Sequence, residues 1–374
     1  MGNKKKLLVI SWCYPPRTGG PATEMVILAE KFALKRELRV KFLVPFPGDE
    51  GKEEIMGVKT NFKFFPLKTL EFITKALLHF AGRREEIQFI QAHDFSVSTV
   101  LAVLLKVLFY PKARIISVFT GDPIFELINY YRKRCPDYEF FRDGKSRLYN
   151  LFFQLYRKLI VKKISLIILP HESLIQDIRR FDEKIQYRVI YPSFPADLFH
   201  SGRIKKEKVI LVVSRMVPWK NVEKAIELFL SVKKKDWKLW VVGEGPLLPF
   251  YLQKYGKREE IEFRTRLSYP ELVTLYQKAY IFLLLSGYET YSISISEALE
   301  AGCIPLVSNI PLFRKRFKNG EVVFMDLHSF SQMKRRLREV MEAYPAEMVG
   351  KKDRGKEKGM GAEDYFSLYS SISP

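Results

Sequence analysis

Residues 7–44 read LLVISWCYPPRTGGPATEMVILAEKFALKRELRVKFLV and alternate a strand, a turn, a helix and a second strand. Residues 7–11 form a short apolar run, and residues 14–21 are rich in proline and glycine. Residues 23–34 carry apolar side chains at helical spacing, and residues 40–44 are apolar again. This strand–helix–strand order predicts a parallel sheet in an α/β protein.

The same alternation continues in two series along the chain. The first series of predicted strands, separated by helices such as 97–108, covers residues 89–90, 114–119, 166–169 and 189–190. The second series covers residues 209–213, 238–242, 261–263, 281–285 and 304–307. We therefore expect two doubly wound halves that face each other across a cleft, with ligands at the carboxyl ends of the strands. We expect an N-terminal domain over residues 1–200 and a C-terminal domain over residues 201–350. Residues 351–374 are expected to form a charged loop and a final helix that returns to the first domain.

The composition is that of a folded, globular chain. It has 374 residues, of which 47% are hydrophobic and 14% aromatic, so a disordered protein and a coiled coil are excluded. The longest apolar run, 97–110, is interrupted by Lys106 and is too short to span a bilayer. The start of the chain does not resemble a secretory signal, so we expect a cytoplasmic protein. Three cysteines, Cys13, Cys135 and Cys303, predict neither a disulfide framework nor a zinc site.

The net charge of +21 indicates an anionic partner, such as phosphate, anionic lipid or nucleic acid. Specific nucleic-acid binding is disfavoured, because the basic residues are dispersed and no known binding motif occurs. Residues 144–163 contain six basic residues and no acid. They also carry one apolar stripe at helical spacing: Leu148, Leu151, Phe152, Leu155 and Leu159. We favour a helix that packs this stripe on the sheet, and the alternative is a helix on a membrane surface.

The segment most informative about chemistry is 286–302, SGYETYSISISEALEAG. It follows a predicted buried strand, turns, and enters a helix, with Glu289 in the turn and Glu297 in the helix. The backbone N–H groups of 291–293 would favour a phosphate at the helix start. Two carboxylates on either side of an anion site suit a ligand with hydroxyl groups, such as a sugar or ribose. The alternative is an ordinary surface acid and a helix-start acid.

Two further turns follow predicted strands of the second series. SRMVPWKN, 214–221, places Arg215 and Lys220 where loops meet phosphate in such folds, the first as a planar clamp and the second as a point charge. VVGEGP, 241–246, ends the next strand with glycines that would let the backbone approach a nucleotide. The order and placement of the three segments together favour a nucleotide site.

With these motifs, the chain resembles the retaining nucleotide-sugar glycosyltransferases of the family-four type (glycosyl transferases group 1). Their GT-B fold has two facing Rossmann-like domains and a deep interdomain cleft. The resemblance covers nearly the whole chain. It rests on Tyr14-Pro15-Pro16 with Gly19-Gly20, on Ile90-Gln91-Ala92-His93-Asp94, on Val189-Ile190-Tyr191-Pro192-Ser193, and on the three segments above.

The resemblance implies a role for each matching residue. Arg215 and Lys220 would contact the donor diphosphate, Glu289 the transferred sugar, and Glu297 the ribose. The implied donor site also includes Gly20, Gly243, Glu244, Gly245, Thr290, Tyr291, Ser292 and Ile293. The acceptor-side candidates are Gly19, His93, Asp94, Thr120 and Asp122. Activation of the acceptor would fall to Asp94, Asp122 or His93, or to the leaving diphosphate itself.

The chain departs from the family pattern at three places. Thr290-Tyr291-Ser292 stands where the family has Gly-Phe-Gly, Gln91 replaces the first histidine of a pair, and Thr120 stands where many members have a histidine. We expect a retaining transfer of a hexose-type sugar in glycan biosynthesis, with no cofactor and no metal. The expected acceptor is a glycan or a lipid-linked sugar, and the expected location is the cytoplasm, with peripheral contact at the inner membrane face. The alternative is an inactive nucleotide-sugar-binding or scaffold subunit of a glycosylation complex.

Overall fold

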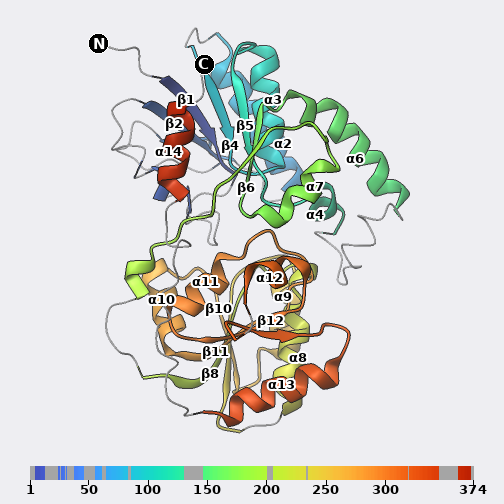
Figure 1. Cartoon of the computed structure of the whole chain (residues 1–374), viewed down its shortest axis with the longest axis vertical. Helices are drawn as coiled ribbons and strands as arrows, with labels where there is room; N and C mark the ends of the chain where they lie inside the picture. The colour runs from blue at the N-terminus through green and yellow to red at the C-terminus, as the bar shows by residue number, and fades with distance from the viewer. Residues whose placement is uncertain are drawn as a thin grey trace.

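The chain is built as two lobes, one above the other in Figure 1. Each lobe contains its own parallel sheet, and all strand pairs between described residues are parallel. This computed structural model describes residues 5–12, 24–25, 27–29, 31, 38–45, 55–60, 65–82, 86–129, 146–199, 205–232, 235–318, 320–344 and 361–371.

The first sheet has seven strands in the order β3-β2-β1-β4-β5-β6-β7. Their bounds are β1 Lys5–Ile10, β2 Leu38–Val44, β3 Ile55–Gly57, β4 Phe89–Ala92, β5 Arg114–Val118, β6 Leu166–Leu169 and β7 Tyr187–Val189. The helices of this lobe are α2 Phe65–Phe80, α3 Val97–Leu108, α4 Pro123–Asn129, α6 Arg147–Leu159 and α7 Ile175–Arg179, with short 3-10 turns η1 Val161–Lys163 and η2 Glu172–Leu174. The turn η3 Ala196–Phe199 leads out of the lobe.

The second sheet has six strands in the order β10-β9-β8-β11-β12-β13. Their bounds are β8 Glu207–Val213, β9 Lys238–Val242, β10 Ile261–Arg264, β11 Ala279–Leu284, β12 Ile304–Ser308 and β13 Val323–Met325. The helices are α8 Val222–Val232, α9 Leu248–Tyr255, α10 Tyr269–Lys278, α11 Ile293–Glu300, α12 Pro311–Arg316 and α13 Phe330–Glu342, with a 3-10 turn η4 Pro218–Lys220. The central strand β11 is buried along its whole length, as expected of a strand covered on both faces.

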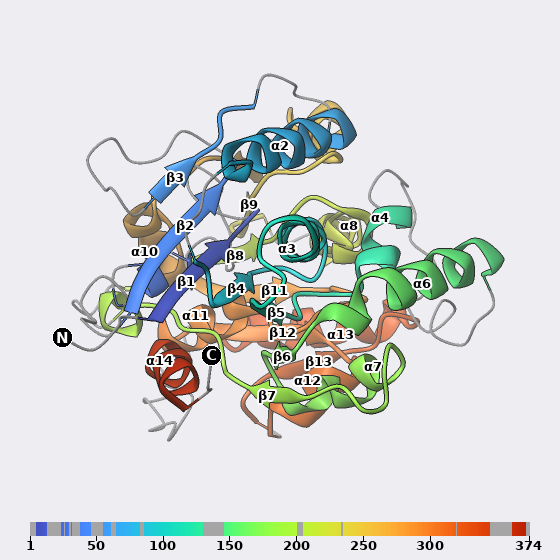
Figure 2. The ribbon, with the colours of Figure 1, turned by 90° about the horizontal axis from the view of Figure 1, so that it is seen from above.

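The last described helix, α14 Gly361–Ser371, lies against the first sheet and not against the second (Figures 1 and 2). Its side chains Tyr365, Leu368 and Tyr369 are buried in one core with residues of β1, β2 and β4. The Lys5 ammonium also donates a hydrogen bond to the Tyr369 carbonyl at 2.9 Å. The opposite face of that sheet is covered by residues of α2 and α3.

The predicted α/β fold with two doubly wound parallel sheets is confirmed. Each strand expected from an apolar run is present, and the helix expected over 97–108 is α3. Strands β3 and β13 were not among the expected strands. The short strand β3 has no apolar run of its own, whereas β13 lies in the apolar run 322–325, which is as long as the predicted strand 166–169. The helix expected over 23–34 falls only partly on described residues, of which Glu24, Met25, 27–29 and Lys31 are helical.

The favoured interpretation of the apolar stripe on α6 is wrong. Its leucines lie on the exposed face of the helix, while Tyr149 and Phe153 are the buried residues of α6. Gly144 and Lys145, which belong to the same predicted segment, lie outside the described residues. Across the described ranges, the structure contains no helix with the length and apolar character to cross a bilayer.

Candidate active site

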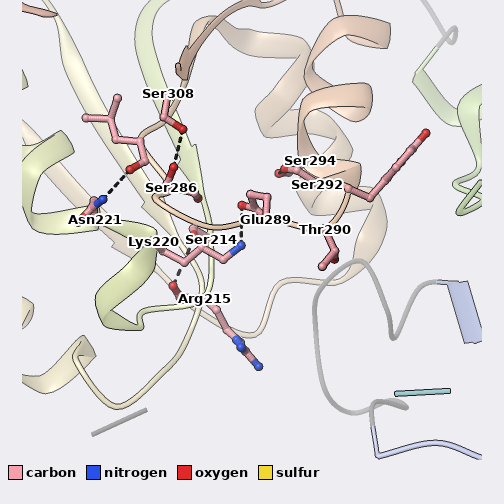
Figure 3. Close-up of polar contacts among 12 residues, drawn as sticks. Ser214, Arg215, Lys220, Asn221, Ser286, Glu289, Thr290, Ser292, Ser294 and Ser308 are labelled. Atoms are coloured by element: carbon pink, nitrogen blue, oxygen red, sulfur yellow. Dashed lines mark hydrogen bonds and ion pairs between the residues drawn. The ribbon is translucent and has the colours of Figure 1, made fainter. Parts of the chain in front are cut away.

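Two loops of the C-terminal lobe bring Lys220 and Glu289 together. Lys220 ends the turn η4 after β8, and Glu289 lies in the loop after β11. The Lys220 Nζ lies 2.6 Å from Oε1 of Glu289, and the two side chains are only 17% and 8% exposed. In Figure 3 these side chains point toward each other between the two loops. The ion pair is therefore shielded from water, where charge interactions are stronger than on the surface.

The backbone fixes the relative position of these two loops. The Gly287 N–H donates to the Trp219 carbonyl at 2.7 Å. Asn221 has a left-handed backbone with φ of 50°, and its Nδ2 donates to the Leu285 carbonyl at 2.9 Å. Asparagine tolerates this conformation better than most residues, so it suits the position directly after Lys220. The Lys220–Glu289 pair is thus held by a rigid junction between neighbouring strands.

Arg215 lies at the boundary between the lobes and not beside Lys220. Its guanidinium Nη2 is 3.5 Å from Oε2 of Glu126 on α4, and the group lies over the Trp219 ring at 5.6 Å. Its side chain is half exposed, and in Figure 3 it points away from Glu289. Desolvation raises the pKa of Glu126 above its ordinary value, while Arg215 and Lys220 oppose that rise. Glu126 therefore places a carboxylate of the first lobe next to both basic residues.

The two glycines after β9 pack closely on the neighbouring loop, and the approach of their turn to a nucleotide stays a prediction. Gly243 has φ of +141°, and a Cβ there would lie 2.0 Å from the Ser214 carbonyl oxygen. Gly245 has φ of +154°, and a Cβ there would lie 2.5 Å from the Met216 carbonyl oxygen. The glycines therefore let this turn pack directly on the loop that carries Arg215.

Glu244, between these glycines, faces solvent. Its Oε1 lies 3.1 Å from Nε of Arg266, which is 85% exposed. This contact leaves Glu244 at the rim of the candidate site.

The turn before α11 contains a serine in a conformation that favours glycine. Ser292 has φ of 67° and ψ of 81°, and it precedes Ile293, the first residue of α11. Arg316 of α12 donates to the carbonyls of Tyr291 and Ser292 and to the Ser296 hydroxyl, and it covers the Tyr291 ring at 3.6 Å. Arg316 therefore stabilises the strained turn from behind.

Replacing Ser292 with glycine is expected to raise the free energy of unfolding by about 0.5–1 kcal/mol, because glycine adopts positive φ without a steric cost. Ser294 is the matched control, since it lies in α11, where a glycine is expected to lower stability by up to about 1 kcal/mol. Urea unfolding of the two variants measures both changes. If Ser292→Gly destabilised the protein as much as Ser294→Gly, the positive φ would carry no strain.

Glu297 is buried and bonded to two tyrosines. Its carboxylate accepts hydrogen bonds from the hydroxyls of Tyr269 and Tyr276 at 2.8 Å each, and the residue is 4% exposed. Burial raises the pKa of Glu297 above its ordinary value, although both hydrogen bonds oppose the rise. The structure places Glu297 on α11, facing α10.

This raised pKa predicts a pH-dependent contribution to stability. In the unfolded chain Glu297 loses its proton near the ordinary pKa of 4.5, whereas in the folded state it keeps the proton to a higher pH. The contribution of Glu297 to the free energy of unfolding is therefore full below pH 4.5. It is lost as pH rises through the folded pKa, by up to about 1.4 kcal/mol per pH unit. The free energy of unfolding of the natural protein, minus that of Glu297→Gln, should therefore fall between pH 4 and 7 in urea titrations. A flat difference would contradict the assignment.

The acceptor-side residues expected to act as bases are engaged in local structure. The Asp94 carboxylate accepts hydrogen bonds from the backbone N–H and hydroxyl groups of Ser96 and Ser98 at the start of α3. The Asp122 carboxylate accepts from the N–H groups of Ile124 and Phe125 at 3.0 Å each, and so caps α4. These contacts favour structural roles for both carboxylates.

His93 is likewise enclosed. It is fully buried, with Nδ1 3.3 Å from Nε2 of Gln91 and Nε2 3.2 Å from Oε2 of Glu24. The hydroxyl of Tyr369 on α14 donates to Oε1 of Gln91. His93 therefore belongs to a buried polar network beneath α14, which favours a structural role over proton transfer from a substrate.

The two lobes meet at the loop after β5. The Asp122 N–H donates to the Tyr288 hydroxyl at 2.7 Å, and the Thr290 hydroxyl donates to the Thr120 carbonyl at 3.2 Å. Phe125 of α4 packs edge-on against Tyr288, with ring centroids 5.1 Å apart. The backbone of Thr120 and Asp122 is thus next to the loop that carries Glu289, while Gly19 and Gly20 lie outside the described residues.

Sequence reasoning missed five residues that shape this region: Glu126, Tyr288, Arg316, and the two hydrogen-bond partners of Glu297, Tyr269 and Tyr276. Tyr288 directly precedes Glu289, so its position in the motif was a usable signal. Asp122-Pro123 is also a recognisable helix start, because proline suits the first position after a cap. No local pattern could have assigned Arg316 to a turn 24 residues earlier in the chain.

Solved structures with the same arrangement are glycosyltransferases of the GT-B class, and this chain has the GT-B fold. Sucrose-phosphate synthase from Thermosynechococcus elongatus superposes with a TM-score of 0.73 over 98% of each chain, at 14% identity. Anabaena HepE in complex with UDP and glucose superposes with a TM-score of 0.67, at 12% identity, over 99% of this chain and 100% of that one.

Within this fold, residues 193–355, which include the C-terminal lobe, match the family described as glycosyl transferases group 1. Among curated proteins, the chain is 29% identical over 127 residues to GDP-mannose:cellobiosyl-diphosphopolyprenol alpha-mannosyltransferase from Xanthomonas campestris. That match covers 32% of this chain and 33% of the relative. The Xanthomonas oryzae protein of the same name is also 29% identical, over 133 residues.

Proposed function

We propose that the chain transfers a hexose from a nucleoside diphosphate sugar to an acceptor hydroxyl, with retention at the anomeric carbon. The observation that carries this proposal is the shielded Lys220–Glu289 pair, at the carboxyl ends of β8 and β11 and next to the loop of the other lobe. A cation and an acid at this point of two facing sheets suit a ligand with a diphosphate at one end and sugar hydroxyls at the other.

In this proposal Lys220 neutralises the charge that develops on the departing diphosphate, and Arg215 adds a second positive charge from the lobe boundary. The carboxylate of Glu289 accepts hydrogen bonds from hydroxyls of the transferred sugar. The bond between the anomeric carbon and the diphosphate oxygen breaks as the acceptor oxygen attacks from the same face. The acceptor proton passes to the leaving diphosphate, which is consistent with the structural engagement of His93, Asp94 and Asp122.

The comparisons narrow the choice of substrates to be tested. The Xanthomonas relatives are named for GDP-mannose and a cellobiosyl-diphosphopolyprenol acceptor, whereas the HepE structure holds UDP and glucose. We propose a glycan or lipid-linked acceptor, with GDP and UDP sugars as the first donors to test. We also propose that no metal or cofactor takes part and that the protein works at the inner face of a membrane.

A thermal-shift screen with UDP, GDP and ADP sugars tests donor binding, because a ligand that binds only the folded state raises the melting temperature. The matching donor should raise it in the natural protein and less in the Lys220→Met/Glu289→Gln double variant. Donor hydrolysis is then measured with the donor that binds. Binding without any turnover, with or without acceptor, would favour the alternative of an inactive nucleotide-sugar-binding subunit. No shift with any donor would contradict both.

A further inference from the structure

Helix α6 has two apolar stripes, and among the described residues only one of them packs against the core of the lobe. Tyr149 and Phe153 are buried, and Tyr156 and Ile160 are packed against the same core. The second stripe lies beside the first at helical spacing and faces solvent. Its exposed fractions are 53% for Leu148, 58% for Leu151, 41% for Phe152, 45% for Leu155 and 58% for Leu159. A contiguous exposed patch of this kind marks an interaction surface.

Basic side chains border this exposed stripe. At about 100° of rotation per residue, Arg147 and Lys158 project beside Leu151 on the edge away from the core. Both are exposed, as are Arg157 and the two lysines of η1, Lys162 and Lys163. The sequence from 146 to 165 contains no aspartate or glutamate. A row of apolar side chains bordered by basic residues, with no acidic residue nearby in sequence, complements a surface with an apolar interior and an anionic outer layer.

The helix projects from the side of the first lobe, as the outermost element beside α4 and α7 (Figures 1 and 2). The exposed fractions given above place its second stripe on the side of α6 away from the described core of the lobe. Arg180 reinforces the inner face, since its guanidinium lies over the Phe153 ring at 5.3 Å and bonds to the Tyr149 hydroxyl at 3.2 Å. The inner stripe thus fixes α6 to the lobe, and the outer stripe stays available.

A short chain of contacts connects α6 to the candidate site. The Tyr149 hydroxyl donates to the Asp122 carboxylate, and the Asp122 N–H donates to Tyr288, which precedes Glu289. A surface that holds α6 would therefore lie close to the acceptor-side loop of the first lobe.

We propose that the exposed stripe of α6, with its basic margin, docks the protein on an anionic phospholipid surface. The leucines enter the boundary between headgroups and acyl chains, and the basic residues contact lipid phosphates. Docking would present the acceptor side of the site to a lipid-linked sugar. Only that last step rests on the proposed function, because docking itself follows from the helix alone.

Co-sedimentation of the full chain with lipid vesicles tests this proposal. Vesicles of phosphatidylcholine alone are compared with an equimolar mixture of phosphatidylcholine and phosphatidylglycerol. The chain should bind the mixed vesicles. Leu151→Gln/Leu155→Gln should weaken that binding by at least about tenfold, since two side chains lose their apolar contact. Arg147→Gln/Lys158→Gln should weaken it by about tenfold or more, at a contribution of about 1 kcal/mol per basic residue.

Matched control variants distinguish vesicle binding by α6 from nonspecific binding by other exposed leucines or lysines. Leu70 and Leu78 of α2 are 62% and 69% exposed, so Leu70→Gln/Leu78→Gln tests exposed leucines elsewhere in the same lobe. Lys235 and Lys257 are exposed in the C-terminal lobe, so Lys235→Gln/Lys257→Gln tests charge alone. Both control variants should bind like the natural protein. All the substituted residues are exposed, so the melting temperature should not change in any variant.

Three results would overturn the proposal: no binding to mixed vesicles, equal binding to both kinds of vesicle, or equal losses in the α2 and α6 leucine variants. If the chain bound RNA but not the mixed vesicles, the proposal would also be overturned. Donor hydrolysis in lipid-free buffer is measured in parallel and should be unchanged in Leu151→Gln/Leu155→Gln. If the natural protein hydrolyses the donor but does not bind the mixed vesicles, docking alone is refuted. Vesicle binding by the natural protein without hydrolysis refutes only the proposed activity.

Discussion

Replacing Lys220 with methionine should lower the rate of sugar transfer by roughly 10²–10³-fold, the usual loss when one preorganised charge is removed from a developing anion. Its ammonium lies 2.6 Å from the Glu289 carboxylate in a site that excludes most water. The same substitution leaves the Glu289 carboxylate without its partner, so it should also destabilise the fold, by up to about 3 kcal/mol. Transfer or donor hydrolysis, measured at saturating donor, gives the rate.

The double variant Lys220→Met/Glu289→Gln separates catalysis from folding. It removes both charges, so its stability should return toward that of the natural protein while activity stays low. Lys254→Met is the matched control, because Lys254 forms an ion pair of similar length, 2.7 Å, with Glu223 on an exposed part of the same lobe. Recovery of activity in the double variant would show that Lys220 only balances the charge of Glu289.

Replacing Gly243 with alanine should lower the free energy of unfolding by roughly 2–4 kcal/mol, through backbone strain and overpacking together. A Cβ at this position would lie 2.0 Å from the Ser214 carbonyl oxygen, and the φ of +141° is unfavourable for alanine. The colliding atom belongs to the backbone, so it cannot rotate away as a side chain can. Urea unfolding measures the loss, and the melting temperature should fall with it.

Gly82→Ala is the control that isolates the collision. Gly82 also has a positive φ, of +83°, but nothing lies within 4 Å of an added Cβ. This variant should lose only about 1 kcal/mol, from strain alone. Donor affinity should fall in Gly243→Ala, because the loop that carries Arg215 must shift, and should not change in Gly82→Ala. Equal losses of stability in the two variants would show that loop packing at Gly243 is unimportant.

The sheets could be predicted from the sequence because buried parallel strands are continuous apolar runs, as in 209–213 and 281–285. Each run is bounded by turn residues, so strand order along the chain was readable. The edge strand β3 has three residues, too few for a pattern to identify, whereas β13 lies in the apolar run 322–325 and was identifiable by the same criterion as the strand at 166–169. The stripe on α6 was misassigned because periodicity shows that a face is apolar but not whether another element covers it.

Site residues could be predicted only where each belongs to a recognisable local segment. Lys220 and Glu289 each follow a predicted strand, and parallel topology alone brings such loops to one edge of a sheet. The contacts that set the environment of the site are long-range. Arg316 supports Ser292, and Glu126 of the first lobe contacts Arg215, a pairing 89 residues apart in the chain. Sequence spacing cannot show such pairings, because they depend on how the two lobes pack.

The position of α14 has a consequence for how the protein forms during translation. Tyr365, Leu368 and Tyr369 complete a core with β1, β2 and β4, yet the ribosome makes them only after the entire second lobe. Until α14 is synthesised, the face of the first sheet that packs against α14 stays partly uncovered. The second lobe, in contrast, can fold as soon as it emerges. The two lobes are therefore unequal in the order in which they can be completed.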